Sequence, residues 1–122
     1  MPARIVVVHD EPAFVEPLAT GLTTVGYDVA TFNDSLLAWN ALEAANKVEL
    51  LITRIRFPPG KPHGVALAKR ACANRPGVRV LFVALPEFEC YTEDLGVFPA
   101  MPIDPAQVVA AAARLLASSL AV

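Results

Sequence analysis

The sequence has little cysteine, no long apolar run and no excess of positive charge. Its two cysteines, Cys72 and Cys90, lack the paired spacing of a metal site, so we expect free thiols. No apolar run approaches the roughly 18 residues that a membrane helix needs. The N-terminal stretch MPARIVVVHD also has too short an apolar run for a signal peptide. We therefore expect a cytoplasmic protein that makes no contact with membranes.

The charges are nearly balanced, because 10 Lys and Arg residues face 12 Asp and Glu residues, a net charge of −2. Nucleic-acid-binding domains usually show a stripe of basic residues. No such stripe occurs here, so we do not expect a nucleic acid as partner. The 122 residues are 55% hydrophobic, which is enough for one buried core and suits a sheet covered on both faces. We predict one domain, residues 1–122.

Continuous apolar, β-branched runs alternate along the chain with segments of helical periodicity. The apolar runs predict strands at 4–10, 27–32, 48–53, 78–85 and 97–101. The periodic segments predict helices from Pro12 to Gly26, from Asn33 or Asp34 to Leu42, from Gly64 to Arg75, and from Asp104 onward. This alternation is typical of an α/β fold with a doubly wound, five-stranded parallel sheet. Pro17 is expected to kink the first helix.

The carboxyl ends of the predicted strands are the expected place for a site in such a sheet. These ends carry His9, Asp10, Arg54, Ala84 and Met101. No serine or cysteine lies at a predicted strand end beside a base, and no glycine-rich loop follows the first strand. The sequence therefore does not predict an enzyme.

Four segments, in chain order, resemble successive parts of the response-regulator receiver domain of two-component signalling. They are RIVVVHDEP, ELLITRIRFPPGKPHGVALAKR, RVLFVAL and MPIDPAQVVAAAARLL. The resemblance covers nearly the whole chain and implies a flavodoxin-like receiver fold with strand order 2-1-3-4-5. The interval from Ala84 to Met101 is shorter than in the family, so we expect a shortened fourth helix within PEFECYTEDLG.

Phosphorylation in that family requires an aspartate nucleophile after the third strand, acidic Mg²⁺ ligands after the first strand, a hydroxyl and a lysine. Here the nucleophile position holds Arg54, and the first acidic position holds His9. The hydroxyl and lysine positions hold Ala84 and Met101, so only Asp10 is retained. Arginine has no carboxylate and stays protonated. The resemblance therefore implies a relic phosphorylation pocket with no cofactor, no tight Mg²⁺ site and no phosphoryl transfer.

We expect Arg54 to pair with Asp10 as a structural ion pair, and mimicry of the active state is the alternative. A weaker alternative is a metal site formed by His9, Asp10, Glu11 and His63.

Three further features have two interpretations each. Phe98 matches an aromatic residue that turns inward on activation in the family, and we expect it to be buried and static, with a rotamer switch as the alternative. Trp39 is expected to pack in or near the core, with a partner hot spot as the alternative. The alanines at 110–113 are expected mainly to pack on the sheet, with a homodimer face on the last helix as the alternative.

The predicted function is a phosphorylation-independent pseudo-receiver, a protein–protein interaction module in bacterial two-component (phosphorelay) signalling. Its partner is expected to be a kinase, an output domain or a second copy of the chain. The alternative is a small-ligand or metal sensor that uses the pocket at the carboxyl ends of the strands.

Overall fold

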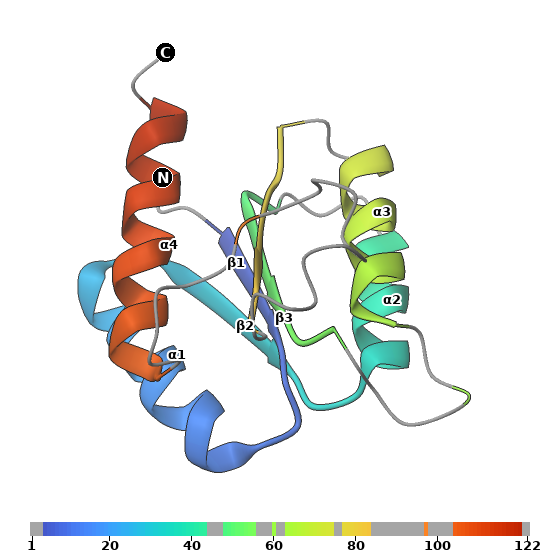
Figure 1. Ribbon diagram of the computed structural model, residues 1–122, viewed down its shortest axis with the longest axis horizontal. Coiled ribbons are helices and arrows are strands. Elements are labelled where there is room, and N and C mark those ends of the chain that lie inside the picture. Colours follow the sequence, from blue (N-terminus) through green and yellow to red (C-terminus); the bar gives the residue numbers. More distant parts are fainter. Residues whose placement is uncertain are drawn as a thin grey trace.

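The computed structural model describes residues 4–43, 48–55, 60, 63–74, 77–83, 97 and 104–120. These residues form three layers, in which a parallel sheet lies between two pairs of helices (Figure 1).

The sheet contains four parallel strands in the order β2-β1-β3-β4. They are β1 (Arg4–Val8), β2 (Asp28–Phe32), β3 (Leu50–Thr53) and β4 (Arg79–Phe82). This order confirms the predicted arrangement of the first four strands. A fifth strand is not shown, because its predicted span is described only at Val97. That residue forms a parallel bridge with Leu81 at the edge of β4.

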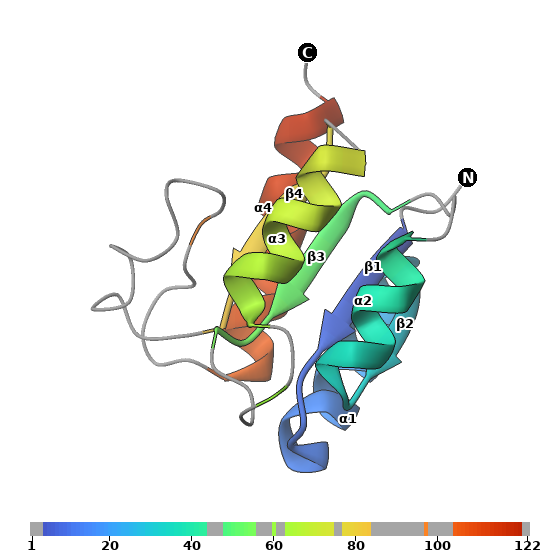
Figure 2. The same ribbon diagram turned by 90° about the vertical axis from the view of Figure 1, so that its right-hand side faces the viewer.

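In the described residues, four helices cover the two faces of the sheet (Figures 1 and 2). α1 (Pro12–Val25) and α4 (Pro105–Leu120) lie on one face, and α2 (Ser35–Glu43) and α3 (Gly64–Asn74) lie on the other. No helix in the described ranges is both long enough and apolar enough to cross a membrane. The predicted short fourth helix falls outside the described residues.

The helices begin and end at the capping residues that the sequence predicts. Asp34 accepts a hydrogen bond from the Leu36 N–H at 2.8 Å, and Asp104 accepts one from the Gln107 N–H at 2.8 Å. Each carboxylate thereby satisfies a backbone donor in the first turn of its helix. α1 ends where Gly26 adopts a left-handed conformation, with φ of 110°.

Pro17 lies inside α1, which runs from Pro12 to Val25 without interruption. Proline has no N–H, so the carbonyl four residues earlier, at Ala13, loses its helical partner. Both Ala13 and Pro17 are exposed, and water can hydrogen-bond to that carbonyl. The exposed position explains why the helix tolerates this proline.

Successive side chains of β1 point to opposite faces of the sheet, and the core therefore has two halves. Val6 and Val8 pack toward α2 and α3, whereas Ile5 and Val7 pack toward α1 and α4. All four residues of β3 are buried, as expected for a central parallel strand. Two of the α4 alanines proposed for a dimer face, Ala111 and Ala112, are buried in this core. The core packing therefore accounts for them without a second copy.

Candidate functional site

The ends of β1 and β3 lie side by side and bring Asp10 and Arg54 together. Val8 and Thr53 are register partners, and the Arg54 N–H donates a hydrogen bond to the Val8 carbonyl at 3.3 Å. The next residues therefore leave the sheet at the same edge. In this way two residues 44 positions apart in the sequence become neighbours.

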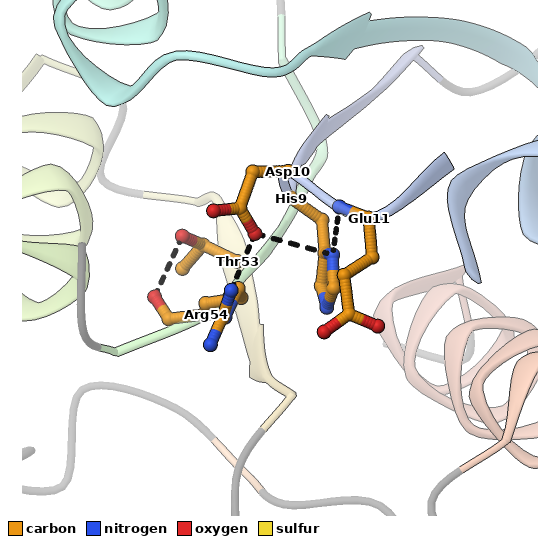
Figure 3. Close-up of polar contacts among 5 residues, drawn as sticks. All are labelled: His9, Asp10, Glu11, Thr53 and Arg54. Atoms are coloured by element: carbon orange, nitrogen blue, oxygen red, sulfur yellow. Dashed lines mark hydrogen bonds and ion pairs between the residues drawn. The ribbon is translucent and has the colours of Figure 1, made fainter. Parts of the chain in front are cut away.

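Asp10 and Arg54 form the expected ion pair (Figure 3). The Arg54 Nη1 donates a hydrogen bond to Asp10 Oδ1. About a third of each side chain is exposed, 33% for Arg54 and 37% for Asp10. Water therefore screens the attraction, and pairs of this kind contribute about 1 kcal/mol or less to stability. The main consequence is chemical, because the guanidinium bonds the Asp10 carboxylate and balances its negative charge.

His9 is buried beside this pair as a neutral imidazole. Its ring stacks on Phe14 with centroids 4.7 Å apart, and its Nδ1 accepts a hydrogen bond from the Glu11 N–H at 3.1 Å. A nitrogen that accepts a hydrogen bond carries no proton. Burial lowers the pKa of His9 and the Arg54 charge lowers it further, against the opposing influence of Asp10 and Glu11. His9 is therefore a packed residue whose Nδ1 holds the Glu11 N–H at the start of α1.

The lowered pKa of His9 predicts a loss of stability in mild acid. The unfolded chain takes up a proton near the ordinary pKa of 6.5, whereas folded His9 resists protonation until a lower pH. The contribution of His9 to stability is therefore present in full above the ordinary pKa, and it falls as the pH drops toward the folded-state pKa. Urea unfolding on both sides of about pH 6.5 measures this. The free energy of unfolding should change less with pH in His9→Gln than in the wild type. His63→Gln, at an exposed histidine, should keep the pH dependence of the wild type. The same pH dependence of the free energy of unfolding in all three proteins would contradict a lowered pKa of folded His9.

The backbone at Arg54 is held from two sides. The Thr53 hydroxyl donates a hydrogen bond to the Arg54 carbonyl at 2.8 Å. Gly64, the first residue of α3, lies directly against the same carbonyl, since a Cβ there would be 1.8 Å from the Arg54 oxygen. The Gly64 N–H also donates to the Ile55 carbonyl at 2.8 Å. The sequence predicted Gly64 only as the start of a helix, because no local pattern of residues predicts this backbone contact.

Three of the predicted site positions cannot be compared with the structure. Ala84, Met101 and Phe98 lie outside the described residues, so their roles in the relic pocket and as a switch stay predictions. In the part of the chain that the structure describes, no three His, Cys, Asp or Glu residues are grouped so that they could hold a metal ion. His63 is exposed at the start of α3, where its Nδ1 accepts a hydrogen bond from the Val65 N–H at 3.3 Å.

Trp39 and Cys72 are both partly buried against the half of the core that α2 and α3 cover. The Arg70 guanidinium lies over the Trp39 ring, 4.9 Å from its centroid, a geometry that favours a cation–π interaction. Cys72 is a free thiol, as expected, and burial raises its pKa. Packing within the chain thus accounts for both residues.

A cavity of about 350 Å³ opens next to the ion pair. We call it the α1–α2 pocket, because it lies between the first turns of these helices. Its principal lining residues are His9, Asp10, Val15, Glu16, Phe32 and Leu37. The sequence predicted a pocket at the strand ends, but it did not identify Val15, Glu16 or Leu37. These side chains come from two helices, and their convergence depends on how the helices pack.

Comparison with known proteins finds similar solved structures, but no matching family model and no matching curated sequence. No protein-family model matches the chain, and no curated protein matches it. Among solved structures, a response regulator receiver protein from Sinorhizobium medicae WSM419 superposes with a TM-score of 0.84 at 21% identity, covering 97% of each chain. A CheY-like receiver domain protein from Methanospirillum hungatei JF-1 gives 0.79 at 20% identity, covering 98% of this chain and 97% of the other. The receiver domain of the hybrid histidine kinase CckA gives 0.70 at 28% identity, covering 93% of this chain and 99% of the other.

Proposed function

We propose that this chain, which has the fold of response regulator receiver domains, is a pseudo-receiver that works without phosphorylation. It acts as a protein–protein interaction module in two-component signalling, and it binds a kinase, an output domain or a second copy of itself. A binding role requires only a complementary surface, so it survives the loss of the phosphorylation residues.

The observation that carries this proposal is the Arg54–Asp10 ion pair. Arg54 stands where the resemblance to receivers places the carboxylate nucleophile, and a guanidinium cannot accept a phosphoryl group in that mechanism. The same guanidinium is bonded to Asp10, the acidic position that this sequence retains. The two charges cancel, which removes much of the attraction for a divalent cation. His9, at the other acidic position, supports the same conclusion because it is neutral and buried.

The direct test is an amide NMR spectrum recorded with and without Mg²⁺ plus beryllofluoride, which mimics a bound phosphoryl group. We expect the amides of Asp10, Arg54 and their neighbours to keep their positions, because the position of the nucleophile holds an arginine and Asp10 is already bonded to it. Shifts clustered at these residues would contradict the proposal. They would instead favour the alternative, a sensor that binds a small ligand or metal at the strand ends.

Arg54→Asp is the matched variant for this test. It restores the carboxylate but leaves Ala84 and Met101 in place of the hydroxyl and the lysine that contact the phosphoryl group in the family. Incubation with acetyl phosphate should therefore leave the intact mass of both proteins unchanged. Appreciable labelling of the variant would show that the pocket needs only its nucleophile, contrary to our account.

A further inference from the structure

The α1–α2 pocket has an apolar side that extends beyond the cavity. Leu37 lines the pocket and is 54% exposed, and the adjacent Leu36 is 44% exposed. These are two of the four large apolar side chains that are exposed in the described part of the chain. Neighbouring exposed leucines beside a cavity are typical of a surface that a partner covers. Both come from the first turn of α2, which begins beyond the carboxyl end of β2 (Figure 2).

The pocket also has acidic lining residues. These are Asp10 and Glu16, and Glu11, which is exposed but not part of the lining, lies between them in the sequence. Arg54 compensates one of these three carboxylates, through its bond to Asp10. Among the residues that the structure describes, no lysine or arginine lines the pocket. The pocket therefore presents net negative charge next to an apolar wall, and it complements a positively charged group attached to an apolar one.

We propose that the α1–α2 pocket binds a segment of a partner protein in which an arginine or lysine stands next to a leucine-sized side chain. The inference deepens the proposed function, on which it rests, by placing the interaction surface and naming the chemistry of the partner. A volume of about 350 Å³ is at the lower end for ligand pockets and suits one or two side chains. Leu36 lies outside the cavity wall, so the occupant must continue past the cavity, as a peptide chain does.

The test uses the dipeptide acetyl-Leu-Arg-amide as a probe, titrated into the whole chain and followed by amide NMR. We expect shifts confined to the lining, at Glu16, Asn33 and Leu37, with a dissociation constant on the order of 1 mM. Leu37→Ser should weaken binding roughly fivefold, because the leucine contact is lost. Leu36→Ser is the matched control, a leucine on the same turn that is also exposed but lies outside the lining. It should change the affinity for this short probe by less than about twofold.

Two further probes separate the possible occupants. Acetyl-Leu-Glu-amide should not bind, and equal binding of both dipeptides would overturn the charge argument. Benzylamine should bind more weakly than acetyl-Leu-Arg-amide, and tighter binding would overturn the peptide assignment in favour of a small organic cation. Absence of any shift at the lining would also overturn the inference. The beryllofluoride experiment is independent of these results, so failure here leaves the proposed function standing.

Discussion

Gly64→Ala is expected to lower the free energy of unfolding by about 3 kcal/mol, at the upper end for overpacking. An alanine Cβ would lie 1.8 Å from the Arg54 carbonyl oxygen and 2.8 Å from both the Arg54 carbonyl carbon and the Ile55 Cα. These are backbone atoms, so no side-chain rotation relieves the clash, and α3 must move away from the end of β3. Urea unfolding of the variant and the wild type measures the difference.

Gly77→Ala is the control for this experiment. Within the described part of the chain, and apart from its chain neighbours, no atom lies within 4 Å of a Cβ built at Gly77, so this change should stay within about 0.5 kcal/mol of the wild type. A similar loss in both variants would mean that glycine flexibility, and not the contact with Arg54, determines the effect. If Gly64→Ala folds, its NMR spectrum should also show displaced amides at Asp10 and Arg54, because the backbone that carries the ion pair has moved.

Phe82→Ala is expected to cost about 4 kcal/mol, within the range for removing a buried aromatic ring. Phe82 is fully buried at the end of β4, in the half of the core that α2 and α3 cover. Its register partner is Thr53, so the resulting cavity would lie beside the strand end that leads to Arg54. Thermal or urea unfolding reports the loss.

Phe32→Ala removes the same side chain from the same half of the core, where Phe32 is only partly buried. We expect a smaller loss, about 2 kcal/mol, because less apolar surface returns to water. Equal losses at the two positions would contradict the view that the degree of burial of each ring determines its contribution to stability.

The sequence by itself determined the order of the elements and the residue types that stand at the ends of the strands. Strand and helix periods are local properties, which is why the buried run in β1 and the caps at Asp34 and Asp104 were predictable. The position of Arg54 directly after β3 follows from the same local pattern. Pairing with Asp10 could also be predicted, since parallel strands that are neighbours end at one edge.

Only the tertiary structure decided what surrounds that pair. Gly64 meets Arg54 through a backbone contact, and the pKa of His9 is lowered because the fold buries its ring against Phe14. Glu16 and Leu37 line one pocket although they belong to helices on opposite faces of the sheet. Such contacts depend on the distances between elements far apart in the chain. A local pattern of residue types contains no information on those distances, because the packing of the whole core sets them.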